Sequence, residues 1–184
     1  MLSDERLMLD FQRGSQEAFT ELFARYRQPI YGYFRRRLAD AARAEELAQE
    51  TFLAVLRAVQ RYEPRALFRT YLYGIALLQL AAERRKSAQR VAIFDLTPAD
   101  PPAAGNTEAE VAVRQALDKL GPDEREVLML REYEQLSYGE IATLQRVPIN
   151  TVRSRLFRAR QALKELLMAR AGQGDTGTPA CAEG

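Results

Sequence analysis

Apolar residues recur three and four positions apart along most of this 184-residue chain, which is the spacing of one face of an α-helix. In the first half, three stretches carry this pattern, over 18–38, 44–59 and 67–86. Pro29 lies inside the first stretch and predicts a kink or a break there. No stretch of useful length alternates apolar and polar residues as a strand does. The sequence therefore predicts an all-α fold that begins with a helix bundle.

Two segments lack the helical pattern. Residues 91–113 carry four acidic and no basic side chains, and the run 95–107 contains three Pro and no aromatic residue. Such a composition cannot offset the entropy lost on ordering. We therefore expect a helix-bundle domain over 1–90, a flexible acidic linker over 91–113, a second helical domain over 114–170 and a disordered tail over 171–184.

The second half is marked by strong helix-boundary signals. Four helices are expected, over 111–120, 122–134, 138–145 and 149–168. Ser137 and Glu140 form a capping box at the start of the third helix. The short third helix, the turn over 146–148 and the long fourth helix predict a helix-turn-helix unit.

Basic residues are concentrated in the last of these helices. The chain has a net charge of only +2, but residues 143–170 alone carry +6. Four arginines fall within eight residues: Arg153, Arg155, Arg158 and Arg160. A helix that enters the DNA major groove needs cations for base edges and phosphates. A basic helix can instead be a solvated face, and Arg155 and Arg160 can cover neighbouring helices with their stems. With the capping box and the turn, the pattern favours DNA binding.

The two halves of this helix-turn-helix, Leu136–Ala142 (LSYGEIA) and Val147–Arg160 (VPINTVRSRLFRAR), resemble the C-terminal DNA-binding domain of extracytoplasmic-function sigma factors. The preceding stretch 117–128 resembles the entry helices of the same domain.

The first domain resembles the same family. Residues 44–58 (AEELAQETFLAVLRA) are similar to the helix by which these factors bind the polymerase clamp. Residues 68–76 (FRTYLYGIA) are similar to the helix that meets the −10 promoter element. The motifs stand in the family's order and cover roughly 15–170.

The resemblance implies an RNA polymerase sigma factor that directs promoter-specific transcription initiation. Its partners would be core RNA polymerase, through the clamp helices, promoter DNA and an anti-sigma factor. It implies −35 contacts by Pro148, Ile149, Asn150, Thr151, Arg153, Ser154 and Arg158. It implies recognition of unpaired −10 bases by Arg65, Arg69, Tyr71 and Tyr73, through stacking and backbone cations. It implies polymerase binding by Glu46, Gln49 and Glu50.

Four positions depart from the family pattern. Tyr71 stands where Trp is usual, which keeps an aromatic ring. Leu78 stands where Asn is usual, and Ala82 stands where Asp or Asn is usual. The −10 hydrogen bonds of those polar side chains therefore cannot be transferred to this chain. Arg146 replaces the usual Gly of the helix-turn-helix turn. If that turn still needs a positive φ, Arg146 is strained by about 1 kcal/mol; otherwise the turn differs.

The inventory of reactive side chains argues against an enzyme. The chain has no His and one Cys, Cys181, which excludes Ser-His and Cys-His catalytic units and zinc sites built from them. We expect no catalytic residue, no cofactor and no metal. No apolar run reaches the roughly 18 residues of a membrane span. We expect a cytoplasmic protein without membrane insertion.

Two alternatives remain open. The chain could be a stand-alone helix-turn-helix transcriptional regulator that dimerises on symmetric sites. It could also be a sigma-like decoy that binds an anti-sigma factor but no promoter. The absence of polar side chains at positions 78 and 82 would agree with this alternative.

Overall fold

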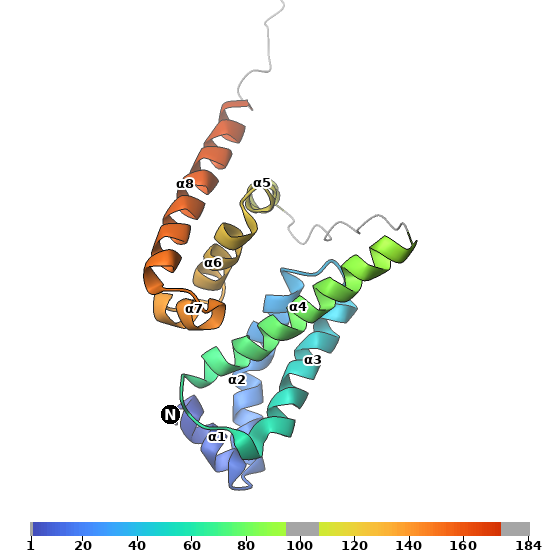
Figure 1. Cartoon of the computed structure of the whole chain (residues 1–184), viewed down its shortest axis with the longest axis vertical. Helices are drawn as coiled ribbons and strands as arrows, with labels where there is room; N and C mark the ends of the chain where they lie inside the picture. Colours follow the sequence, from blue (N-terminus) through green and yellow to red (C-terminus); the bar gives the residue numbers. More distant parts are fainter. Residues whose placement is uncertain (1, 95–106, 174–184) are drawn as a thin grey trace, which may run out of the picture. The chain divides into compact units, whose positions relative to one another are not determined.

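The computed structural model describes residues 2–94 and 107–173, with side chains over 2–90 and 107–170. These residues form α-helices, one short 3₁₀ turn and loops, and no strand occurs among them. The chain divides into two compact units, Met1–Pro102 and Ala103–Gly184. The predicted all-α class is confirmed (Figure 1).

The first unit contains four α-helices: α1 (Asp4–Gln12), α2 (Gln16–Arg35), α3 (Ala41–Ala58) and α4 (Phe68–Phe94), with the 3₁₀ turn η1 (Val59–Arg61) after α3. Polar side chains start the first three helices, because Ser3, Ser15 and Asp40 each accept hydrogen bonds from free backbone N–H groups. These caps explain where the helices begin.

Helix α2 continues through Pro29, so the break allowed by the sequence does not occur. The proline is exposed, whereas Leu22 before it and Ile30 and Phe34 after it are buried on one face. Proline has no backbone N–H, so the helix lacks one hydrogen bond at this position. Burial of apolar side chains on both sides of the proline offsets this loss and keeps the helix continuous.

Helix α1 has no counterpart in the sequence prediction. Its Leu7 and Met8 are buried in the bundle core. The core continues through buried side chains of the other three helices: Leu22, Ile30, Phe34, Leu47, Val55, Phe68, Leu72 and Leu80.

The second unit contains α5 (Glu108–Asp118), α6 (Pro122–Glu132), α7 (Tyr138–Gln145) and α8 (Ile149–Gln173). The capping box of Ser137 and Glu140 is present at the start of α7, as predicted. The core lies where α6, α7 and α8 meet and is formed by Val127, Leu130, Leu136, Ile141, Val152, Leu156 and Ala159. A short helix, a turn and a long helix form the predicted helix-turn-helix.

The helices extend into the segment predicted as linker, 91–113. Helix α4 ends at Phe94, and α5 begins at Glu108 because Thr107 and Glu110 form a second capping box. The remainder of that segment, 95–106, lies outside the described residues. Helix α8 includes the first three residues of the predicted tail, and 174–184 lie outside the described residues.

Candidate nucleic-acid interface

The turn between α7 and α8 keeps the backbone shape that a glycine would favour. Arg146 adopts the left-handed conformation, with φ 54° and ψ 44°. Its N–H donates to the carbonyl of Thr143, and the N–H of Val147 donates to the carbonyl of Ala142 at 3.1 Å. The turn therefore needs a positive φ, and Arg146 adopts it at a cost of about 1 kcal/mol.

Helix α8 has one buried and one exposed face at its N-terminal end. Val152, Leu156 and Ala159 are buried against the rest of the unit. The side chains predicted to contact the −35 element are exposed, except for the half-buried Thr151: Pro148, Ile149, Asn150, Arg153, Ser154 and Arg158. They gather at the start of one helix, as a groove-reading surface requires.

Two hydrogen bonds order this surface. Arg153 Nη1 donates to Asn150 Oδ1 at 3.1 Å, and Ser154 Oγ donates to the carbonyl of Thr151 at 3.0 Å. Arg153 and Asn150 are exposed neighbours one turn apart, so both can reach the same partner.

Phe157 belongs to the same surface, although the sequence prediction omitted it. Its side chain is 65% exposed, which is unusual for a phenyl ring on a helix that has an apolar buried face. Its position in the sequence could have indicated this, because Phe157 lies four residues after Arg153, on the same face of the helix, and one residue before Arg158. An exposed ring between two arginines can contact a thymine methyl or stack on a base.

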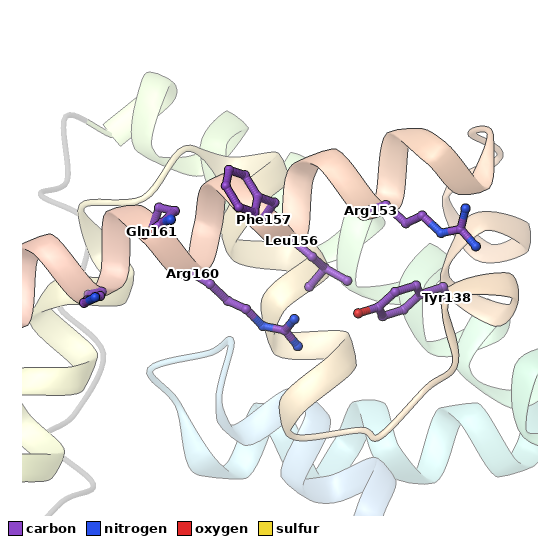
Figure 2. A pocket seen from close by; sticks show the side chains of 7 residues that line it. Tyr138, Arg153, Leu156, Phe157, Arg160 and Gln161 are labelled. Carbon is purple, nitrogen blue, oxygen red and sulfur yellow. The ribbon is translucent and has the colours of Figure 1, made fainter.

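A shallow pocket of about 510 Å³ lies beside Phe157 and is lined by Tyr138, Arg153, Leu156, Phe157, Arg160, Gln161 and Lys164. In Figure 2, the guanidinium of Arg160 and the ring of Tyr138 extend toward each other from α8 and α7. The pocket thus combines cationic, aromatic and amide groups beside the exposed start of α8.

Three arginines of α8 pair with acidic residues of α6. Arg155 donates to Asp123, Arg158 Nε donates to Glu124 Oε1 at 3.2 Å, and Arg160 Nη2 donates to Glu132 Oε1 at 2.8 Å. The expectation that Arg155 and Arg160 can cover a neighbouring helix agrees with these contacts. Part of the charge on the helix is thereby balanced within the unit.

The first unit carries a second candidate surface at the loop between η1 and α4. Arg65 has a side chain that is 84% exposed and pairs with Glu63 at 2.6 Å. Arg69 is half-buried, and so is Tyr71, whose ring meets that of Tyr62 edge-to-face with 5.3 Å between centroids. Burial raises the pKa of Tyr71 above its ordinary value.

Tyr73 does not join this surface, which corrects the sequence prediction. Its side chain is 3% exposed and its ring packs on that of Tyr33 at 5.7 Å between centroids. A nucleic-acid base cannot reach a ring so placed. Phe68 and Leu72 are core residues.

Three of the four departures from the family pattern lie on α4: Tyr71, Leu78 and Ala82. Leu78 is 69% exposed and Ala82 is half-buried. Helix α4 therefore presents an apolar side chain to solvent where an amide is usual.

The polar face of α3 is the third candidate surface. Glu46, Gln49 and Glu50 are all exposed. Arg43 Nη1 donates to Glu46 Oε2 at 2.8 Å and to Glu50 Oε1 at 3.2 Å, and its Nη2 donates to Glu83 Oε2 of α4 at 2.8 Å. These contacts raise the pKa of Arg43, chiefly through the hydrogen bond to Glu83. Arg43 thus orders two of the predicted polymerase contacts, a role that the sequence did not indicate.

Gln49 lies on a different part of α3. It lines a pocket of about 300 Å³ between α2 and α3, together with Phe23, Arg27, Tyr31 and Phe52. The predicted polymerase contacts therefore divide into an ion-paired part and a part beside an aromatic pocket.

Within the described ranges, no three or more Cys, Asp or Glu side chains gather as a metal ion would need. In the same residues, no helix is both long enough and apolar enough to cross a membrane.

The fold and the exposed start of α8 define a helix-turn-helix protein with a separate helical unit. Comparison with known families agrees: "Sigma-70 region 2" matches residues 22–90 and "Sigma-70, region 4" matches residues 110–163.

Full-length relatives are similar over most of the chain. RNA polymerase sigma-H factor of Pseudomonas aeruginosa is 36% identical over 180 residues, which cover 89% of this chain and 93% of the relative. RNA polymerase sigma factor CarQ of Myxococcus xanthus is 34% identical over 163 residues, which cover 85% of this chain and 93% of the relative. ECF RNA polymerase sigma-E factor of Escherichia coli K12 is 30% identical over 181 residues, which cover 88% of this chain and 93% of the relative. The chain belongs to the sigma-70 family, among the extracytoplasmic-function sigma factors, and is a transcription initiation factor.

Solved structures are similar as well. The structure of CnrH in complex with the cytosolic domain of CnrY matches with a TM-score of 0.71 and 26% identity, over 90% of this chain and 97% of that one. The sigma factor RpoE of Bartonella quintana, in complex with the anti-sigma factor NepR, matches with a TM-score of 0.67 over 82% and 96%. At 23% identity the second likeness concerns the fold alone.

Proposed function

We propose that the two units of this sigma factor divide promoter recognition between them, and that α3 binds core RNA polymerase. One observation carries the proposal: Asn150, Arg153, Ser154, Phe157 and Arg158 are exposed together at the start of α8. This face has the hydrogen-bonding, cationic and apolar groups that base edges and phosphates require.

At the −35 element, Arg153 is the main candidate for reading a base. Its guanidinium can bind the acceptors of guanine in two hydrogen bonds, and each such pair discriminates by about 1–3 kcal/mol. Pro148, Ile149 and Thr151 complete the proposed contact surface from the turn and the first turn of α8.

At the −10 element, the loop at Arg65 and the start of α4 form the proposed surface for unpaired bases. Arg65 and Arg69 supply cations for the backbone, and the partly exposed ring of Tyr71 supplies a stacking surface. Tyr73 is left out because it is buried.

The proposed polymerase contacts are Glu46, Gln49 and Glu50, which would face the clamp helices. The proposal includes an anti-sigma factor as a regulator of this chain, as the family resemblance implies; RpoE of Bartonella quintana, which shares the fold, is in complex with the anti-sigma factor NepR. In this role the protein acts in the cytoplasm with polymerase and DNA, and contributes binding surfaces rather than catalytic groups.

Run-off transcription with purified core polymerase tests the proposal. The wild-type protein should co-purify with core enzyme and give promoter-specific transcripts. Failure of both would refute it. Binding of an anti-sigma factor without any transcript would favour the decoy alternative, which the exposed Leu78 suits.

Two variants separate the surfaces. Arg153→Ala should lower transcription and leave core binding unchanged. Glu50→Arg should abolish core binding, because a polymerase site that binds a carboxylate repels a cation. Equal loss of core binding in both would indicate misfolding and would count against the residue assignments.

A further inference from the structure

Helix α1 holds both ends of the loop that precedes α4. At one end, Glu5 Oε1 accepts a hydrogen bond from the backbone N–H of Phe68 at 2.7 Å. At the other end, Gln12 Nε2 donates to the carbonyl of Val59 at 2.9 Å and to that of Tyr62 at 3.2 Å. All three contacts are partly buried and join residues more than forty positions apart.

The contact at Phe68 replaces a missing cap. The first N–H groups of a helix have no partner within it, and a side-chain oxygen normally accepts from them. Leu67 stands directly before α4 and offers no such oxygen. The carboxylate of Glu5 takes this place from another helix, where its negative charge is favourable at the helix N-terminus.

Between its fixed ends the loop is open to solvent. Glu63, Pro64, Arg65, Ala66 and Leu67 are all exposed. The ends are also bound by aromatic packing, because the ring of Phe68 meets those of Tyr26 and Tyr62 at 5.6 and 6.2 Å between centroids. An exposed loop with rigid ends presents its middle, and Arg65 with it, in a limited set of positions.

We propose that Glu5 and Gln12 are positioning residues for the capture of unpaired −10 bases. Helix α1 then belongs to the promoter-reading apparatus, although it lies before the residues 22–90 that match the family's region 2. This inference rests on the proposed −10 role of the loop. In this proposal Glu5 and Gln12 do not contact DNA. They act by holding the loop and the first turn of α4 in place.

The test compares open-complex formation by holoenzyme made with wild-type, Glu5→Ala, Glu5→Gln and Gln12→Ala proteins. Arg6→Ala is the matched control, because Arg6 is on the same helix, is exposed and, among the described residues, pairs through its side chain with Asp10. The template is a promoter that the wild-type holoenzyme opens, selected from a library with a randomised −10 region. Core-polymerase affinity and the exchange rate of the Phe68 amide hydrogen are measured on the same proteins.

Glu5→Ala should lower open-complex formation roughly fivefold, as expected for the loss of a cap worth about 1 kcal/mol, and should speed exchange at Phe68 by a similar factor. Gln12→Ala should also lower opening. Glu5→Gln keeps an accepting oxygen and should restore most of the activity, and Arg6→Ala should match wild type. Core affinity should be the same in all five proteins.

Wild-type opening by Glu5→Ala would overturn the inference. Loss of core affinity in parallel with opening, or equal loss in Glu5→Ala and Glu5→Gln, would also overturn it, since these results indicate a general structural role. A wild-type holoenzyme that assembles but opens no promoter in the library would refute the proposed function itself, and the exchange rate at Phe68 would still show whether Glu5 caps α4.

Discussion

Arg158 of α8 donates through Nε to Glu124 of α6 at 3.2 Å, so a cation proposed to contact promoter DNA is bound by a carboxylate in the free protein. The pair is at the surface, with the Arg158 side chain 59% exposed. Exposed ion pairs contribute about 0–1 kcal/mol, so DNA phosphates can displace Glu124. Binding then includes the loss of this pair.

Replacement of Glu124 should strengthen −35 binding. Glu124→Gln removes the competing charge, and we expect roughly two- to fivefold tighter binding of a −35 duplex by holoenzyme. Fluorescence anisotropy with labelled duplex measures this. Asp123→Asn is the matched control, because it changes the net charge equally but removes the acidic partner of Arg155, which is not among the proposed DNA contacts. Equal gains in both variants would show that only long-range charge matters.

Replacement of Arg146 should stabilise the second unit. Arg146→Gly removes the penalty of a side chain in the left-handed region and should add about 0.5–1 kcal/mol to the free energy of unfolding. In a small domain, this corresponds to a rise in Tm of a few degrees, measurable by calorimetry. Arg146→Ala keeps the Cβ and the penalty, and therefore should give no such gain. A gain as large in Arg146→Ala would assign the effect to the arginine side chain instead.

Removal of Arg43 should destabilise the first unit. Glu83 has a side chain that is only 9% exposed, and its contact at 2.8 Å to Arg43 joins α3 to α4. Arg43→Ala leaves this carboxylate without its nearest cation, at an expected cost of about 1–3 kcal/mol. Denaturant unfolding followed by circular dichroism measures the loss. Arg57→Ala, an exposed change on the same helix, should stay within about 0.5 kcal/mol. A cost for Arg43→Ala no greater than that for Arg57→Ala would contradict the assigned role.

Alkaline pH should destabilise the first unit partly through Tyr62. Burial raises the pKa of Tyr62 to about 12, from an ordinary value near 10. Between these two values the unfolded chain loses the phenolic proton first, so the unfolded state binds fewer protons and stability falls as pH rises. Below pH 10 both states keep the proton, and stability is unaffected by this group.

Tyr62→Phe removes the titrating group and should flatten this alkaline fall. The Tyr62 hydroxyl has no hydrogen-bond partner among the described residues, so the substitution should cost little at pH 7. Unfolding free energies of both proteins over pH 8–12 test this. Parallel curves would show that other groups account for the fall.

Local signals explain which parts of the fold could be predicted. Helix α7 begins and ends where expected because the capping box of Ser137 and Glu140 and the turn before Pro148 lie within a few residues of its ends. Helix α1 has only nine residues, fewer than three helical turns, so its apolar residues do not recur often enough to predict a helix. Residues 108–113 of the predicted linker belong to α5, whose beginning is set by the side chains of Thr107 and Glu110 rather than by an apolar pattern.

The site was predicted less completely, because its contacts join distant positions. Tyr73 was placed among the −10 residues by motif, but it lies three positions before the buried Ala76 and seven before the buried Leu80, on the core face of α4. That spacing could have excluded it. The contacts of Glu5 with Phe68 and of Arg158 with Glu124 depend on how helices cross, and no local pattern indicates them.

The pairing of α8 with α6 has a consequence for how promoter preference can change in evolution. Arg155, Arg158 and Arg160 all find their acidic partners on α6, a helix that contributes none of the proposed base contacts. A mutation in α6 can therefore release or restrain a DNA-contacting arginine without altering any residue proposed to face the DNA. Genetic suppressors of a weakened −35 sequence should then arise in α6 as well as in α8, and two descendants of this protein with identical recognition helices could still favour different promoters.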